Sequence, residues 1–145
     1  MRFQSNQATC GPAALRNALM ARGLTRSEEE LEALSGCTPA AGTSPRGLLK
    51  AISAVSADLP GLSPLVISES RADVALLKLV AALETYAVIL CVDGDSHWVC
   101  AFGRLGPLIH VADSAHPELV VHLTRDAMMA RWKGHGRKPY YGIVI

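Results

Sequence analysis

The side chain in this sequence best suited to nucleophilic chemistry is Cys10, which stands directly before Gly-Pro at the start of an apolar helical pattern. A cysteine attacks as its thiolate, and the positive end of a helix beside a protonated histidine stabilises that form. Pro12 fits the first turn of a helix, where its missing N–H is not needed. Three other cysteines lack this setting: Cys37, Cys91 and Cys100. By itself Cys10 is better explained as a small buried residue, so a nucleophilic role requires a base.

A base is predicted by the segment HWVCAFGRLGPLIHVAD at 97–113. Two runs of seven residues flank RLG, whose final glycine suits the left-handed position of a three-residue hairpin loop. If Gly103 pairs with Pro107, the same register places His97 directly opposite Asp113, with Cβ atoms about 5 Å apart. The carboxylate would bind one imidazole nitrogen and leave the other as a base. The alternative interpretation is an ordinary polar pair at the end of a sheet.

The sequence offers one alternative cysteine–histidine pair and one alternative acid. The same register places Cys100 opposite His110 on the other face, but a cysteine in the middle of a strand has no helix terminus to lower its pKa. Asp95 is an alternative acid, although it lies only two residues before His97 in a turn. We therefore favour Asp113 as the orienting carboxylate.

A side-chain amide upstream of Cys10 is the remaining requirement for acyl transfer, because the reaction develops an oxyanion. Gln7 lies only three residues before the cysteine, too near to reach across a site. Gln4 is the better candidate. The predicted catalytic set is therefore Cys10, His97, Asp113 and Gln4.

The elements that must position these residues divide the chain into a helical first part and a strand-rich second part. Helices are predicted over 10–22, 27–36, 45–57 and 70–83, with a strand at LVIS before the last of these. From Tyr86 onward come five β-branched or apolar runs, and a short helix capped by Thr124 precedes the final run. This order predicts an α+β fold, with helices packed on an antiparallel sheet in a single domain spanning 1–145.

Composition limits the function classes. The 145 residues are 50% hydrophobic and 19% charged, and the formal net charge is +1, so no basic face for nucleic acid is expected. The polar start MRFQSNQATC does not resemble a secretory signal. The apolar region at 74–92 is interrupted by Lys78 and Glu84, which favours a helix and a strand over a membrane span. We therefore predict a soluble, cytoplasmic protein with free thiols, without a metal site and without direct membrane insertion.

In combination, the motifs QSNQATCGPAAL, HWV and VAD resemble the papain-like bacteriocin-processing peptidases, which cleave leader peptides after a double glycine. The segment GTSPRGLLKAI is similar to the loop and helix between the catalytic halves of that family. The resemblance implies a papain-like cysteine peptidase fold in which Cys10 attacks, His97 is the base, Asp113 orients it and Gln4 helps to bind the oxyanion. Thr9 departs from the pattern, because an acidic residue usually precedes the cysteine.

The resemblance implies hydrolysis of a peptide or protein substrate, with no cofactor and with a separately encoded transporter as a candidate partner. Two alternatives stay open. One is another thiol acyl-transfer enzyme, such as an amidase, deamidase or transpeptidase, which would use the same side chains. The other is a non-catalytic peptide-binding module with an unreactive Cys10.

Overall fold

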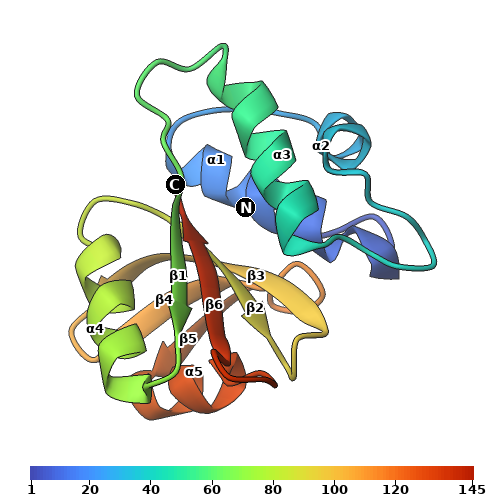
Figure 1. Ribbon diagram of the computed structural model, residues 1–145. Helices are drawn as coiled ribbons and strands as arrows, with labels where there is room; N and C mark the ends of the chain where they lie inside the picture. The colour runs from blue at the N-terminus through green and yellow to red at the C-terminus, as the bar shows by residue number, and fades with distance from the viewer.

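The computed structural model describes all 145 residues, and Figure 1 shows its helices and strands. The helical elements are η1 (Gln7–Thr9), α1 (Cys10–Ala21), α2 (Glu28–Ser35), α3 (Pro45–Ser56), α4 (Ala72–Ala82) and α5 (Arg125–Trp132). The strands are β1 (Leu65–Glu69), β2 (Val88–Val92), β3 (His97–Leu105), β4 (Leu108–Ala112), β5 (Val120–Thr124) and β6 (Tyr140–Val144). Every predicted helix and strand is present and all strand pairs are antiparallel, which confirms the α+β prediction.

Local sequence signals account for the helix boundaries. Ser27, Ser44 and Thr124 each accept a hydrogen bond from the backbone N–H three residues later, at the starts of α2, α3 and α5. Gly36 ends α2 with φ of +68°, a left-handed conformation that glycine adopts without strain. These short polar residues and this glycine therefore set the lengths of the helices.

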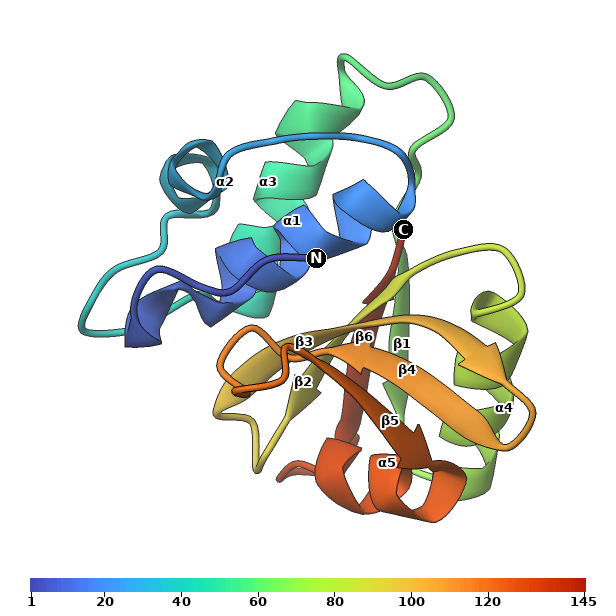
Figure 2. The ribbon, with the colours of Figure 1, turned by 180° about the vertical axis from the view of Figure 1, so that it is seen from behind.

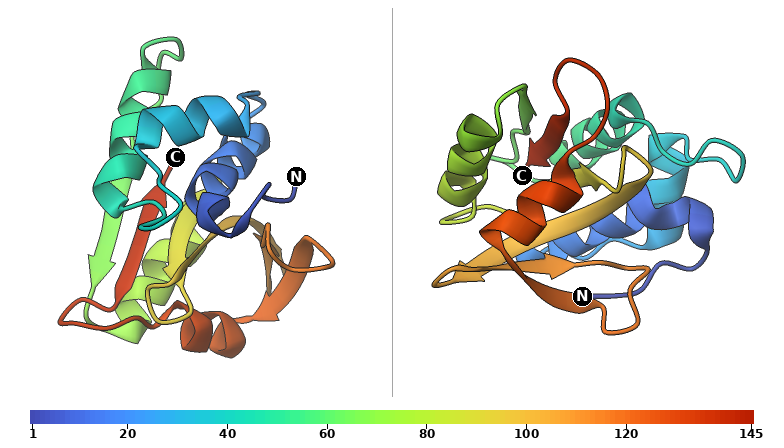
Figure 3. Two further views of the ribbon diagram at one scale, coloured as in Figure 1. Left: turned by 90° about the vertical axis from the view of Figure 1, so that its right-hand side faces the viewer. Right: turned by 90° about the horizontal axis from the view of Figure 1, so that it is seen from below.

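The six strands form one sheet in the order β1-β6-β2-β3-β4-β5. Helices α1, α2 and α3 lie together on one side of this sheet, and α4 and α5 lie on the other (Figures 1 and 2). The sheet is strongly curved, so that β4 and β5 turn toward α5 (Figure 3). The molecule therefore has three layers, and the sheet is the middle one.

Each face of the sheet has its own core. The alternation of side chains along β2 and β3 sends successive residues to opposite faces. Cys91, Trp98 and Cys100 join the apolar cluster beneath α1 and α3. Val92 and Val99 join the second cluster, which includes Leu79 of α4 and Met128 of α5. By the same alternation, His97 belongs to the α5 side of the sheet.

The β3–β4 hairpin does not have the predicted register. Arg104 and Leu105 continue β3, so the loop has only two residues, Gly106 and Pro107, and Leu105 pairs with Leu108. Gly106 has φ of +57° at the first loop position, as a tight turn starting with glycine requires. The prediction that Gly103 pairs with Pro107 is therefore wrong, and Gly103 pairs with His110 instead.

A β-bulge between Ala101 and Gly103 restores the arrangement on which the site depends. Beyond the bulge Ala101 pairs with Val111 and Cys100 with Ala112. Continuing this pairing sets the residue after β4, Asp113, on the same face as the first residue of β3, His97, and diagonal to it. Without the bulge the two side chains would point to opposite faces, because a slip of one residue reverses the orientation of every side chain.

Candidate active site

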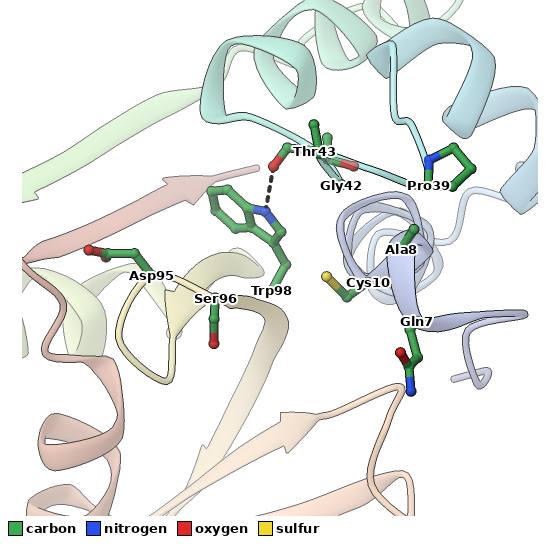
Figure 4. A pocket seen from close by; sticks show the side chains of 10 residues that line it. Gln7, Ala8, Cys10, Pro39, Gly42, Thr43, Asp95, Ser96 and Trp98 are labelled. Carbon is green, nitrogen blue, oxygen red and sulfur yellow. Dashed lines mark hydrogen bonds between the residues drawn. The ribbon is translucent and has the colours of Figure 1, made fainter.

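Cys10 is the first residue of α1 and follows the 3-10 turn η1. It is 7% exposed and lines a cavity of about 270 Å³. Figure 4 shows its sulfur in that cavity, between Gln7 and Ala8 on one side and Trp98 on the other. The other walls are formed by small or polar residues of two loops: Pro39, Ala41, Gly42, Thr43, Asp95 and Ser96. The thiol therefore lies at a helix N-terminus, as the sequence predicts, and it also lines an open cleft.

His97 and Asp113 are in direct contact. The imidazole Nε2 lies 2.7 Å from the Asp113 carboxylate Oδ1, and the two side chains are 15% and 4% exposed. The same Oδ1 accepts a hydrogen bond from the Ala115 N–H at 3.1 Å. Asp113 thus occupies Nε2 of His97 and leaves Nδ1 available on the other side of the ring.

His97 is also within hydrogen-bonding reach of the Cys10 thiol. Cys10 comes from the helical layer on one side of the sheet, whereas His97 and Asp113 belong to the face that α5 covers. They meet because His97 is the first residue of β3 and Asp113 follows the last residue of β4, so both lie at the end of the sheet. The contact therefore joins two layers that the sheet otherwise separates.

The contacts among these groups shift their protonation. Burial raises the pKa of the Cys10 thiol, but hydrogen bonds from His97 and from the backbone of Trp98 and Gly11, with the His97 charge, bring it below its usual value. Burial lowers the pKa of His97, but its bonds to Asp113 and Cys10 raise it to about 9. The environment thus favours a thiolate beside an imidazolium, which is the reactive form of a cysteine nucleophile.

The other three cysteines lack this environment. Burial raises the pKa of Cys91 and of Cys100 to about 12. Cys100 pairs with Ala112 rather than with His110, so the rival pair considered from the sequence is not formed. Cys37 lies in a loop, where its thiol donates to the Ala8 carbonyl at 3.2 Å.

Two residues beside His97 have roles other than orienting it. Asp95 lines the cavity, but its Oδ2 accepts a hydrogen bond from the His135 N–H at 2.8 Å. No hydrogen bond joins Asp95 to His97, so the alternative acid is not placed to orient the base. Trp98 is buried in the core, and its ring also forms a wall of the cavity. Its indole N–H donates to the Thr43 carbonyl at 2.9 Å (Figure 4).

Gln4 lies between the turn before Cys10 and the residue after Asp113. Its Nε2 donates to the Asn6 carbonyl at 2.7 Å, and its Oε1 accepts from the Ser114 hydroxyl at 2.8 Å. An amide nitrogen carries two hydrogens, so one donor remains after the bond to Asn6. Gln7, the alternative amide, is exposed and lines the cavity, which Gln4 does not.

Comparison with known proteins rests on structure, because no protein-family model and no curated sequence matches this chain. The peptidase domain of Streptococcus ComA, a bi-functional ABC transporter involved in quorum sensing, superposes with a TM-score of 0.74 and 18% identity, covering 98% of this chain and 93% of that one. The chain has the papain-like fold of this peptidase domain.

Two further solved structures share that fold. A double glycine motif protease from an AMS/PCAT transporter, in complex with the leader peptide, gives a TM-score of 0.69 at 16% identity, covering 99% of this chain and 86% of its own. The peptidase domain of Streptococcus mutans ComA gives 0.66 at 18% identity, covering 100% and 98%. The resemblance seen in the sequence motifs is therefore confirmed at the level of the papain-like peptidase fold.

One residue of this site, Arg131, was not predicted from the sequence. It is the penultimate residue of α5 and the first residue of the basic stretch RWKGHGRK. Its guanidinium donates to the Asp113 Oδ2 at 2.6 Å. Hydrogen bonds and charge from His97 and Arg131 outweigh burial and hold the pKa of Asp113 well below its usual range. The basic stretch at 131–138 predicts a solvated loop, and nothing in its spacing relates its first arginine to an aspartate on another element.

Thr9, which departs from the family pattern, is held by contacts within the N-terminal turn. Thr9 is fully buried, and its hydroxyl donates to the Asn6 carbonyl at 3.0 Å. The Ser5 hydroxyl lies 3.4 Å from the Thr9 hydroxyl and donates to the carboxylate of Glu28 from α2 at 2.6 Å. A buried acid therefore lies beside the residue before Cys10, although it comes from another helix.

None of the helices combines the length and the apolar composition that a membrane-spanning helix requires. No group of three or more histidine, cysteine, aspartate or glutamate side chains is arranged to hold a metal ion.

Proposed function

We propose that this chain is a cysteine peptidase in which Cys10 is the nucleophile and His97 the general acid and base. One observation carries the proposal: a thiol at a helix N-terminus, in an open cleft, lies within reach of a histidine whose Nε2 is bound to a buried carboxylate. A buried packing cysteine would need neither the histidine nor the cleft. The shared fold of transporter peptidase domains supports the same assignment.

In the proposed reaction the Cys10 thiolate attacks a peptide carbonyl carbon, and the carbonyl oxygen becomes an oxyanion. The Gln4 amide and the Cys10 backbone N–H stabilise this charge. The His97 imidazolium then donates its proton to the leaving amine, and the C–N bond breaks to give a thioester. A water molecule, deprotonated by His97, attacks the thioester and releases the acid and the thiolate. Asp113 orients His97 throughout.

The proposed substrate is a precursor peptide cleaved after small residues such as Gly-Gly. The lining of the cleft includes the small residues Ala8, Ala41 and Gly42, which leave room for a substrate with small side chains. Structures that share the fold include a protease solved with its leader peptide. A separately encoded transporter that exports the product is the proposed partner.

The test uses purified protein and a synthetic peptide containing a Gly-Gly site. Cleavage is expected for the wild type and for Cys37→Ala, which removes a thiol that does not contact His97. Cys10→Ala and His97→Ala are expected to lose it. Wild-type rates in either of the last two variants would rule out the mechanism. Mass spectrometry of the products separates hydrolysis of the backbone from side-chain deamidation or ligation.

A further inference from the structure

Arg131 of α5 binds two aspartates near the site, Asp93 in the turn before His97 and Asp113 after β4. One guanidinium nitrogen donates to Asp113 Oδ2 at 2.6 Å and to Asp93 Oδ2 at 2.9 Å, and Nε donates to Asp93 Oδ1 at 2.9 Å. In return, the Asp93 backbone N–H donates to the Arg131 carbonyl at 3.0 Å. Both the carboxylate and the backbone N–H of Asp93 therefore bind Arg131.

Asp93 lies in the turn that connects β2 to β3 and therefore precedes His97. It has φ of +54°, so this turn has an unusual backbone conformation for a residue other than glycine. The clamp on Arg131 therefore fixes the turn before His97 relative to α5. The same guanidinium reaches Asp113, which binds His97 from the other side.

We propose that Arg131 is a positioning residue that holds Asp113, and through Asp113 the imidazole of His97, in the orientation needed by Cys10. The inference rests on the proposed catalytic roles of these three residues. Arg131 itself contacts neither Cys10 nor His97 through any hydrogen bond.

The geometry at Asp113 explains why a second partner matters. Its Oδ1 binds His97 and the Ala115 N–H, and its Oδ2 binds Arg131. A carboxylate fixed at only one oxygen can rotate about its Cβ–Cγ bond, because that terminal torsion is broad. With Arg131 on the second oxygen the plane of the carboxylate is set, and with it the direction in which the imidazole is held. The Asp113 side chain is only 4% exposed, so without Arg131 its negative charge would be buried with less compensation.

A double-mutant cycle tests whether Arg131 acts through Asp113. The four proteins are the wild type, Arg131→Met, Asp113→Asn and the double variant. In the wild-type background Arg131→Met is expected to lower kcat about tenfold to hundredfold, a range typical of one charge-assisted hydrogen bond, with KM nearly unchanged. In the Asp113→Asn background the same substitution is expected to change kcat by less than about twofold, because the group through which Arg131 acts is gone.

A second measurement on the same four proteins needs no substrate. The rate at which iodoacetamide alkylates Cys10, followed by mass spectrometry of the peptide that contains it, reports the thiolate that His97 stabilises. This rate is expected to fall in Arg131→Met and to show the same non-additivity with Asp113→Asn. If the alkylation rates are coupled but the wild type cleaves no peptide, the proposed peptidase function fails and the role of Arg131 stands.

The control variant is Arg125→Met, which removes an exposed arginine from the first turn of the same helix and is expected to leave both rates unchanged. Arg131→Lys is expected to recover part of the loss, because it keeps the charge but not the two-pronged bond to Asp93. Equal fold losses from Arg131→Met in both backgrounds would overturn the proposal, as would no loss in the wild-type background.

A milder variant serves if Arg131→Met does not fold. Asp93→Asn keeps both Arg131 and Asp113 and weakens only the clamp on the guanidinium. A smaller loss of Cys10 alkylation that disappears in the Asp113→Asn background is expected. A loss of the same size in both backgrounds would contradict the positioning role.

Discussion

At the scale of single residues, the site depends on one histidine held between a thiol and a carboxylate. Asp113 binds Nε2 of His97, and Cys10 is within reach on the other side. The imidazole is then both more basic and fixed in direction. Its protonation state therefore decides both the reactivity of Cys10 and part of the local stability.

The raised pKa of His97 predicts a pH limit for activity. In the proposed mechanism the imidazolium supports the thiolate and protonates the leaving amine, so kcat/KM and Cys10 alkylation should show a plateau around neutral pH. Turnover should fall as pH rises through about 9, where His97 loses its proton. A pH profile of peptide cleavage checks this, and activity that still increases above that value would contradict it.

The same shift predicts a change in stability with pH. The ordinary pKa of a histidine is 6.5 and that of folded His97 is about 9, so its protonation favours the folded state. This contribution is complete below pH 6.5 and is lost as pH rises through about 9. The thermal midpoint of the wild type should decline over this window more than that of His97→Gln.

Gln4 and Gln7 can be distinguished by mutation. If Gln4 supplies the oxyanion donor, Gln4→Ala should lower kcat about 10²–10³-fold, as removal of such a donor does in other acyl-transfer enzymes. Gln7→Ala, which truncates an exposed side chain at the rim of the cleft, should change mainly KM. The opposite ranking of kcat would assign the oxyanion role to Gln7.

At the scale of elements, the close approach of α1 to the 37–44 loop shapes the cleft. A Cβ on Gly11 would lie 2.6 Å from Thr43 Cβ and 2.7 Å from its Oγ1. Thr43 is itself fixed, because its carbonyl accepts the Trp98 indole N–H. Gly11 is therefore required next to Cys10 for packing, independently of its backbone freedom.

We expect Gly11→Ala to destabilise the protein by about 1–3 kcal/mol, since overpacking of a tight contact has costs of this size. It should also lower kcat/KM by moving the loop away from Cys10. Chemical denaturation and peptide cleavage measure the two effects. Thr43→Gly removes the three side-chain atoms that would crowd the new Cβ, namely Cβ, Oγ1 and Cγ2, so the double variant should recover stability relative to Gly11→Ala alone. An unaltered denaturation midpoint in Gly11→Ala would show that the loop yields freely.

At the scale of the whole molecule, the N-terminal segment joins the helical layer to the sheet. Arg16 of α1 donates to the Phe3 carbonyl at 2.6 Å and forms an ion pair with Glu28 at 2.8 Å. Glu28 accepts from the N–H and the hydroxyl of Ser5 at 2.9 and 2.6 Å. Gln4 lies between these anchored residues and bonds to Ser114 beside the candidate acid, Asp113. The buried ion pair between Arg16 and Glu28 in the helical layer thus helps to position Gln4, which contacts Ser114 beside the sheet.

Arg16→Met should destabilise the protein by about 3–5 kcal/mol, because it leaves the Glu28 carboxylate buried without its partner. Arg16→Met combined with Glu28→Met should regain much of that stability, since apolar side chains can replace a buried ion pair. The double variant should nevertheless have a lower kcat than the wild type, because the backbone around Gln4 loses its anchors. Thermal unfolding and peptide cleavage of the three proteins test this, and wild-type turnover in the double variant would show that the anchors serve stability alone.

The sequence by itself determined the order and type of the elements and the four candidate residues. Periodicity, caps such as Ser27 and Thr124, and glycine stops are local signals, so they can be read along the chain. The setting of Cys10 before Gly-Pro is equally local, and its structural outcome matches the prediction.

Only the tertiary structure decided how these residues meet. The hairpin register depends on a two-residue turn and a bulge, neither of which was predicted. Together they shift the pairing by an even number of residues, so His97 and Asp113 still lie on the same face of the sheet. The contacts from Arg131 to Asp113, and from Glu28 through Ser5 to Thr9, cross between elements far apart in the chain. Such contacts carry no sequence period, since they arise from the packing of layers, and for that reason the second partner of Asp113 was visible only in the folded molecule.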